Sequence, residues 1–466
     1  MTLTDEPATT PSTTPGTTPT TTPLLAPSYR LATIGMVSLV FLAAFEALAV
    51  TTIMPTVSAD LHGRAWFSAA FSATLAASVV GMVVAGLWSD RNGPRLPLLA
   101  SVVVFAGGLL LAGLAPNIGL FVAARFLQGL GGGAMTVALY VVVARIYAPI
   151  DHPRIFGAFA AAWVIPSMVG PSIAGAVLEA FGWRWVFLGV VALAAGATVL
   201  LLPGLRDLVD NPEPSPLASG RRLLLAVVVA GGVVAVDLAG RAPASVGFAA
   251  AAVAVAVLLV AVRPLLPAGT LVARRGLPAV VLLRGAIAAT FFATEIYLPY
   301  LLQERYDVPA WLSGVTLTVG ALGWSGASHV QARLGARLDH HAALRLGAAL
   351  LLGGVAGELA ACALELTPFL IAAAWVLAGA GMGLMFPRIS ALVLAASNER
   401  DQGGNSAAMA IADAVGGATA ISLTGLVFTA VGPASELAPF VAALVLTTVL
   451  AAGALVVSRR VEHVLV

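Results

Sequence analysis

The sequence predicts an all-α polytopic membrane protein. Hydrophobic residues make up 59% of the chain and charged residues only 10%, whereas soluble domains average roughly 45–50% apolar and roughly 25% charged residues. The mean hydropathy is +0.98. The apolar residues also fall in runs of about 20, the length that a helix needs to cross the hydrocarbon core of a bilayer.

Fourteen stretches qualify, or nearly qualify, as membrane spans, and they fall into a group of six, a shorter pair and a second group of six. They cover residues 31–56, 66–87, 96–115, 118–146, 155–180, 184–203, 223–240, 246–262, 278–303, 310–334, 342–362, 368–395, 404–430 and 437–457. We therefore expect a six-helix bundle over residues 30–204, a linker with two extra helices over 205–276, and a second six-helix bundle with a short tail over 277–466.

The first residues, 1–29, form a Thr/Pro-rich tract with little hydrophobic content. Such a tract buries too little apolar surface to offset the entropy of ordering it, so we expect a disordered tail. It lacks the basic start and apolar core of a secretory signal, which indicates that the first span is retained.

The basic residues predict the orientation. The chain has 24 basic residues and no lysine, and most of the arginines fall in connections on one side if the N-terminus is cytoplasmic. The positive-inside rule then predicts an even number of spans, with both termini in the cytoplasm. Arg284 falls at an inner span boundary in this scheme. We expect a bacterial cytoplasmic membrane protein, and a net charge of +2 gives no indication of a nucleic-acid partner.

The two groups of six spans share a repeat. When the sequence is aligned with itself at an offset of 249 residues, Glu46 matches Glu295, and each lies near the middle of its own span. The same offset matches Gly86 with Gly335 and Asp90 with Asp339. Transporters commonly double a helical unit in this way. The repeat predicts two six-helix bundles related by pseudo-twofold symmetry, with the extra pair inserted between them.

The connection after the second span, GLWSDRNGPR, carries the first motif. Its members are Gly86, Asp90, Arg91, Gly93 and Arg95. Glycine permits close helix approach at the first position and a tight turn at the fourth, and the aspartate can lie near a helix N-terminus. The motif resembles the signature of the major facilitator superfamily, although Pro94 stands where that family usually has a basic residue. The resemblance implies a latch that sets the balance between outward-facing and inward-facing states.

The fourth span contains RFLQGLGGG, residues 125–133. This stretch is similar to the fourth-span motif of the same superfamily, with an intramembrane arginine and a stripe of glycines. Arg125 should face a polar cavity or pair with a carboxylate, because a lone charge in the bilayer is costly; bonding to backbone carbonyls is the structural alternative. Gln128, one turn further on, is expected in the substrate cavity.

The fifth span contains WVIPSMVGPSIAG. It resembles the antiporter signature of the superfamily's drug exporters, with Ala174 in place of one usual glycine. Proline removes a backbone donor and glycine allows close packing, so this helix can bend where it seals against a partner. The motif residues are Pro166, Gly170, Pro171 and Gly175.

The first span, with FEALAVTTIMP, completes the resemblance to the fourteen-span drug:proton antiporter branch, over about residues 30–460. Glu46 stands where that branch usually has aspartate. A carboxylate near the bilayer centre is costly unless it is neutral, hydrated or paired, and this is the property needed to exchange a proton for a substrate. The resemblance implies a proton-coupled exporter of amphipathic, cationic drugs working by alternating access, with Glu46 and Glu295 as proton-coupling residues in the central cavity.

The other acidic residues within spans are open to more than one interpretation. Asp413 is either a proton site or the partner of Arg125 or Arg388. Asp237 has Arg241 four residues on, which favours a local ion pair. Three glutamates toward the outer ends of their spans are expected at the membrane interface: Glu179, Glu358 and Glu365.

Four aromatic residues flank Glu295 along its helix: Phe291, Phe292, Tyr297 and Tyr300. They could form an apolar, cation-accepting pocket. Packing or lipid contact is the alternative, because residues at this spacing cannot all face one side of a helix.

We find no sequence motif of an enzyme, an ATPase or a metal site. We therefore expect no cofactor and energy from a proton gradient, with a small molecule or lipid, protons and membrane lipids as partners of a monomer. Two other functions stay open on this evidence. One is lipid or glycolipid export on the same fold, and the other is a membrane sensor or scaffold that transports nothing.

Overall fold

The computed structural model describes residues 23–27, 29–148, 151–206, 208, 219–334, 337–397, 402–432 and 436–461. Within these ranges the chain is helical and has no strand, as the sequence predicts. The predicted tail lies largely outside the described residues, and Gly335 lies outside them as well. The long helices are α1 (Arg30–Asp60), α2 (Phe67–Asn92), α3 (Arg95–Gly113), α4 (Ile118–Ile146), α5 (His152–Phe181), α6 (Arg184–Leu201), α7 (Ser219–Ala239), α8 (Ala244–Val262), α9 (Leu277–Glu295), α10 (Tyr297–Tyr306), α11 (Ala310–Leu334), α12 (His340–Ala363), α13 (Pro368–Ala395), α14 (Gln402–Val431) and α15 (Ala438–Ser458). Short 3₁₀ helices cover Arg64–Trp66, Leu202–Leu205, Arg263–Leu265 and Thr270–Val272.

Thirteen helical segments in the described part of the chain are long and apolar enough to cross a membrane, and α9 with α10 counts as one of them. Helix α11, which corresponds to the tenth predicted span (residues 310–334), is not among these thirteen. It packs along α5 of the first group of helices and α13 of the second.

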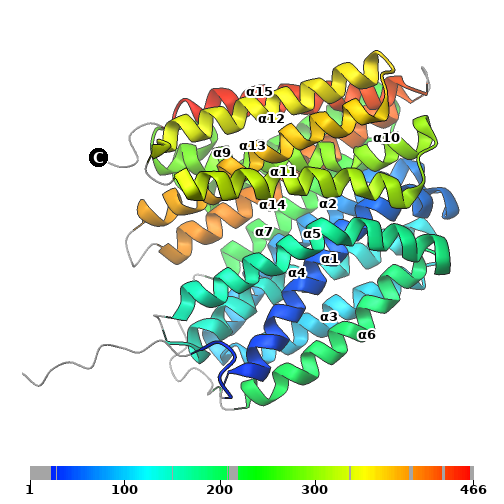
Figure 1. The fold of residues 1–466 in the computed structure, drawn as a ribbon. Coiled ribbons are helices and arrows are strands. Elements are labelled where there is room, and N and C mark those ends of the chain that lie inside the picture. Colours follow the sequence, from blue (N-terminus) through cyan, green and yellow to red (C-terminus); the bar gives the residue numbers. More distant parts are fainter. Residues whose placement is uncertain are drawn as a thin grey trace, which may run out of the picture.

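The helices pack in two groups (Figure 1). Helices α1 to α6 contact one another, and so do α9 to α15. The groups meet along two seams, formed by α5 with α11 and by α2 with α14. The inserted helices α7 and α8 pack together, and α7 lies against both α2 and α14. As expected, the inserted pair lies at the gap between the halves.

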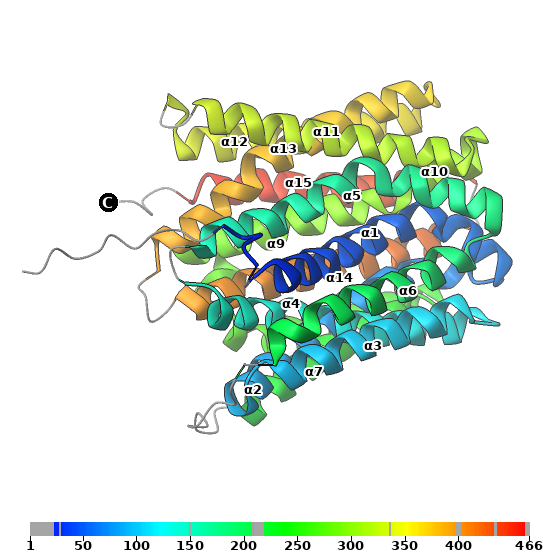
Figure 2. The ribbon, with the colours of Figure 1, turned by 60° about the horizontal axis from the view of Figure 1, so that its bottom comes forward.

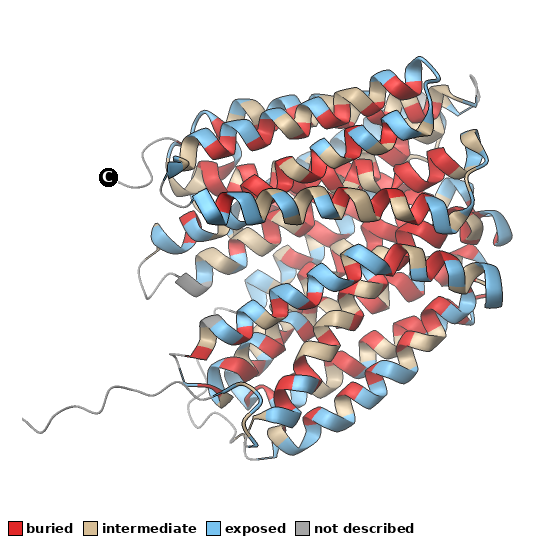
Figure 3. Cartoon of the chain, in the orientation of Figure 1, coloured by how far each residue is buried: buried red, intermediate tan, exposed pale blue. Residues whose placement is uncertain are grey.

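We call the end of the assembly where α1 begins and α15 ends the basal end, and the opposite end the distal end. The ribbons of the two groups converge at the distal end and diverge toward the basal end (Figures 1 and 2). Buried residues are frequent where the groups meet (Figure 3). Large apolar side chains such as Val103 and Val260 are more than two-thirds exposed, at 71% and 73%, as expected of surfaces that face lipid.

The ninth predicted span, expected as one helix over residues 278–303, is broken in two. Helix α9 ends at Glu295, and α10 begins at Tyr297. The physical cause is Pro299, which lacks a backbone N–H and whose ring conflicts with the carbonyl of the residue four positions earlier. That residue is Glu295, so the break lies at the carboxylate itself.

Candidate functional site

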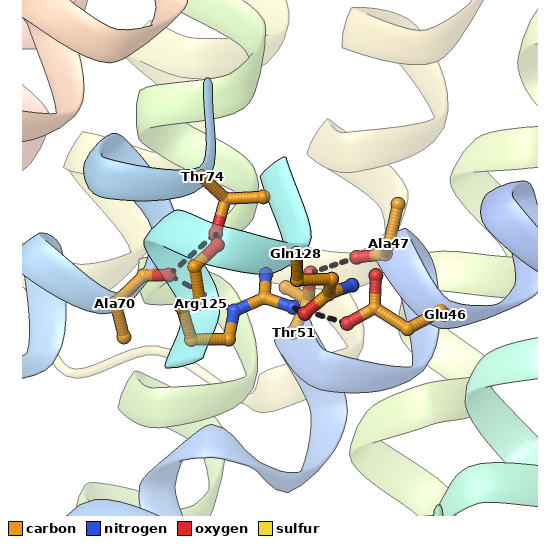
Figure 4. A network of polar contacts seen from close by, with 7 residues as sticks. All are labelled: Glu46, Ala47, Thr51, Ala70, Thr74, Arg125 and Gln128. Carbon is orange, nitrogen blue, oxygen red and sulfur yellow. Dashed lines mark hydrogen bonds and ion pairs between the residues drawn. The ribbon is translucent and has the colours of Figure 1, made fainter. Parts of the chain in front are cut away.

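Glu46, Arg125 and Gln128 form a buried polar cluster between α1, α2 and α4 (Figure 4). The guanidinium of Arg125 makes an ion pair with the Glu46 carboxylate. Its Nη1 also donates to Oε1 of Gln128 at 2.5 Å, and its Nε donates to the carbonyl of Ala70 at 3.1 Å. Glu46, Arg125 and Gln128 are each at most 3% exposed. Both sequence interpretations of Arg125 therefore hold, since it binds a carboxylate and a backbone carbonyl.

The glycine stripe explains how α4 brings Arg125 so close to α2. A Cβ at Gly129 would collide with the carbonyl oxygen of Thr74, and one at Gly133 would collide with that of Ser78. The hydroxyl of Thr74 adds a bond between the helices, because it donates to the backbone carbonyl of Arg125 at 3.2 Å. Backbone contact at this range is possible only for small residues. The glycine stripe therefore allows α4 to pack closely on α2.

Glu295 lies at a similar depth in the other half but in a different environment. At 1.5 Å per helical residue, Glu46 is about 24 Å from the start of α1 and Glu295 about 27 Å from the start of α9. Glu295 is half-buried, and within the described residues it has no hydrogen bond or ion pair. The two halves thus carry one paired carboxylate and one uncompensated carboxylate.

The aromatic residues near Glu295 do not gather around it as one pocket. Phe291 is buried and stacks on Trp375, with ring centroids 4.4 Å apart. Tyr297 and Tyr300 are also buried and belong to a distal cluster that includes Phe67 of the other half. In this state these three side chains pack against other aromatic rings and do not form a cation-accepting pocket around Glu295. Phe292 is half-buried and lies near the α2–α14 seam, where its Cδ2 is 3.1 Å from a Cβ built on Gly417.

Asp413 pairs with an arginine that the sequence analysis did not consider. Its carboxylate accepts bonds of 2.9 and 3.0 Å from Nε and Nη2 of Arg284. Arg284 is 5% exposed and lies inside α9, with its guanidinium over the ring of Phe386. The expected partners of Asp413 were therefore wrong, and so was the boundary position of Arg284. Arg388 instead donates from Nε to Gln331 at 2.8 Å.

Two other acidic residues also differ from expectation. Glu358 is 1% exposed, and neither carboxylate oxygen has a hydrogen-bond partner in the described chain, so an interface position is wrong. Asp237 accepts bonds from three serine hydroxyls, while Arg241 lies over the ring of Trp66. The expected local ion pair between them is therefore wrong.

The other two expected interface glutamates lie where the sequence places them. Glu179 is exposed near the distal end of α5, and Glu365 is exposed and pairs with Arg305.

The motif after the second span forms the basal connection between α2 and α3. Gly93 has φ +71°, which confirms the tight turn. A Cβ at Gly86 would meet only Val137, at 3.9 Å, so close helix approach does not require glycine there in this state. The charged members Asp90, Arg91 and Arg95 are exposed at this end.

The fifth-span motif lies at the seam between α5 and α11. A Cβ at Gly175 would be 2.5 Å from Cα of Trp311, and one at Gly314 would be 2.7 Å from the carbonyl of Pro171. Pro166 and Pro171 both lie inside α5, and a Cβ at Gly170 would meet the Phe45 ring at an ordinary 3.4 Å. The seal between α5 and a partner helix is thus formed by direct backbone contact at the distal end.

Polar contacts between the halves, which the sequence does not predict, also lie at the distal end. Arg64 pairs with Glu304 at 2.7 Å, and Nε2 of Gln303 donates to the carbonyl of Thr52 at 3.0 Å. Charged residues in short loops gave no signal that could pair them across 240 positions. With the aromatic cluster and the α5–α11 contact, they close the distal side.

Comparison with known proteins agrees with this architecture. The family model described as Major Facilitator Superfamily matches residues 36–420. The chain belongs to the major facilitator superfamily. A solved structure of a bacterial homolog of the human lysosomal transporter Spinster has the same fold, with a TM-score of 0.65 at 14% identity over 93% of this chain and 98% of that one.

Two bacterial members of the superfamily align with most of the chain. The multidrug transporter MdtP of Bacillus subtilis is 24% identical over 85% of this chain and 74% of its own length. The multidrug efflux pump SdrM of Staphylococcus aureus is 24% identical over 78% and 81%. An uncharacterized transporter of Schizosaccharomyces pombe is 31% identical over 41% of this chain, and that alignment spans about a third of the relative, 32%.

Proposed function

We propose that this superfamily member is a proton-coupled antiporter that exports amphipathic cationic molecules by alternating access. The two bacterial relatives named for multidrug transport support drug export, and the carboxylate of Glu295, unpaired among the described residues, supports a cationic substrate. The arginine bias of the connections supports a basal end in the cytoplasm of a bacterium. The contacts between the halves at the distal end support a state that is open toward the cytoplasm.

The observation that carries the proposal is the charge balance of the two carboxylates, which lie at similar depth in the two halves. Glu46 is neutralised by Arg125, whereas Glu295 has no counter-ion among the described residues. A proton or an organic cation can each supply the missing positive charge at Glu295, but both together would leave an excess. The two ligands therefore compete, and competition between a proton and a substrate is the basis of antiport.

Glu46 is a second carboxylate, in the first half, whose protonation can change how helices pack. Protonation of Glu46 removes its attraction for Arg125, which holds α1 to α4 through the buried cluster. Because the pair has almost no contact with water, the change in charge acts at low dielectric and is large. A proton on either carboxylate thus changes how the helices around the centre are held.

The test is efflux of a cationic dye such as ethidium from vesicles under an imposed pH gradient. Glu46→Gln and Glu295→Gln should each abolish gradient-driven efflux while membrane levels stay normal. Glu179→Gln, which removes an exposed carboxylate at the distal end of α5, is the matched control and should transport like the wild type. Gradient-driven efflux at wild-type rate in both central variants would refute the proposal, and labelled phospholipid as substrate tests lipid export in the same vesicles.

A further inference from the structure

Asp237 connects the inserted helix to both halves of the protein. It lies on α7, two residues before the helix ends, and is 8% exposed. Its Oδ1 accepts a bond of 3.1 Å from Ser68, and its Oδ2 accepts bonds from Ser72 and, at 2.9 Å, from Ser422. The first two serines belong to α2 and the third to α14, so one carboxylate bridges the seam between the halves.

Few charged groups face this carboxylate. The helices packed against α7 are α2, α8 and α14, and α8 contains no ionisable residue. The ionisable residues of α2 and of the described part of α14 lie toward the basal ends: Asp90, Arg91 and Asp413. The nearby groups are the phenol of Tyr297 and the guanidinium of Arg241. The guanidinium is held over the indole of Trp66, 3.0 Å from the ring centroid.

The serine hydroxyls can bond a neutral carboxyl group as well as an ionised one, and burial favours the neutral form. An ionised carboxylate buried between helices without a counter-ion in contact is costly. A protonated carboxyl donates one hydrogen bond and accepts others, and each serine hydroxyl can donate or accept. The hydroxyl oxygens already touch the carboxylate at hydrogen-bond distance, which leaves no gap for a metal cation between them. The ligand that fits this site is a proton.

We propose that Asp237 is a further proton-binding site, located on the inserted helix, and that its protonation allows the distal seam between α2 and α14 to close. When the halves separate, Ser422 leaves with α14 and water reaches the carboxylate, which can then ionise. Closing the seam requires that a proton be taken up again. The proposal uses only the alternating movement of the halves from the proposed function, and it gives the inserted pair a role in gating.

Distance measurement between spin labels on the distal side tests this inference. The only cysteine, Cys362, is replaced by serine, and labels are attached at Ala65→Cys before α2 and Glu436→Cys after α14, both exposed positions. In lipid nanodiscs the wild type should show more of the long-distance population at about pH 8.5 than at about pH 5.5, with a change in population ratio of at least about tenfold. Asp237→Asn, which mimics the neutral form, should keep the short distance at both pH values.

Three further variants make the result decisive. Glu179→Gln should respond to pH like the wild type. Ser422→Ala removes only the α14 hydroxyl, so it should increase the long-distance population at both pH values and keep the pH response. Glu46→Gln should lose proton-driven efflux but keep the response of the seam, which separates this inference from the proposed function. A wild-type pH response in Asp237→Asn would overturn the inference, and so would a permanently long distance in that variant.

Discussion

Breaking the ion pair between Glu46 and Arg125 should give unequal costs, depending on which partner is removed. Both side chains are at most 4% exposed, so whichever charge remains is buried. Removing one partner of a buried pair typically costs about 3–5 kcal/mol. Glu46→Gln should cost about 3 kcal/mol, the low end of that range, because the amide oxygen can still accept a bond from the guanidinium. Arg125 cannot lose its charge at ordinary pH, so in this variant its buried guanidinium stays uncompensated at both about pH 5 and about pH 8.

Arg125→Met leaves a carboxylate instead, and a carboxylate can bind a proton. Its cost should therefore be smaller at about pH 5 than at about pH 8, and the double variant should be more stable than Glu46→Gln. We expect a coupling free energy of at least about 2 kcal/mol between the two substitutions. Thermal unfolding can be followed with a thiol-reactive dye, because the only cysteine, Cys362, is buried. Additive costs within about 0.5 kcal/mol would refute the pairing.

Three other substitutions test the packing and the latch. Gly129→Val introduces an isopropyl group, whose Cβ would already collide with the Thr74 carbonyl, and should prevent α4 from packing on α2; a wild-type unfolding temperature would contradict this. Gly175→Val should separate α5 from α11 and shift the protein toward the distal-open state, as seen by increased labelling of cysteines placed on the distal side. Ala174→Val, one residue away, should not give the same increase in labelling, because Ala174 packs in the core. Asp90→Asn should slow cycling in vesicles and leave equilibrium substrate binding within about threefold of the wild type; a loss of binding with normal cycling would exclude a latch at this position.

The sequence predicted the fold because its signals are local and strong. Runs of apolar residues, the arginine bias and the glycine spacing of α4 each depend on neighbours along one helix. The break at Glu295 was missed although its cause is also local, since Pro299 interrupts the helix four residues later. In predicting where a span begins and ends, the position of a proline is therefore as informative as the hydropathy of the span.

The partners of the buried charges depend on how helices cross, which no single helix encodes. Asp413 had several candidate arginines in the sequence, and its partner Arg284 lies 129 positions away on α9. Asp237 had an arginine at helical spacing, yet its carboxylate faces α2 and α14, while Arg241 faces Trp66. Glu46 and Arg125 both lie on motifs of one family, and a paired or polar environment was expected for each, but the sequence did not pair them with each other.

Proton release on substrate binding tests the account most directly. Tetraphenylphosphonium, a lipophilic cation, is added to detergent-purified protein in weakly buffered solution with a pH indicator, and bound cation is counted in parallel. The account predicts release of about one proton per bound cation at the pH where Glu295 is protonated, and no release from Glu295→Gln. Binding of the cation to the wild type without release of a proton would contradict the claim that protons and substrate compete for the same carboxylate.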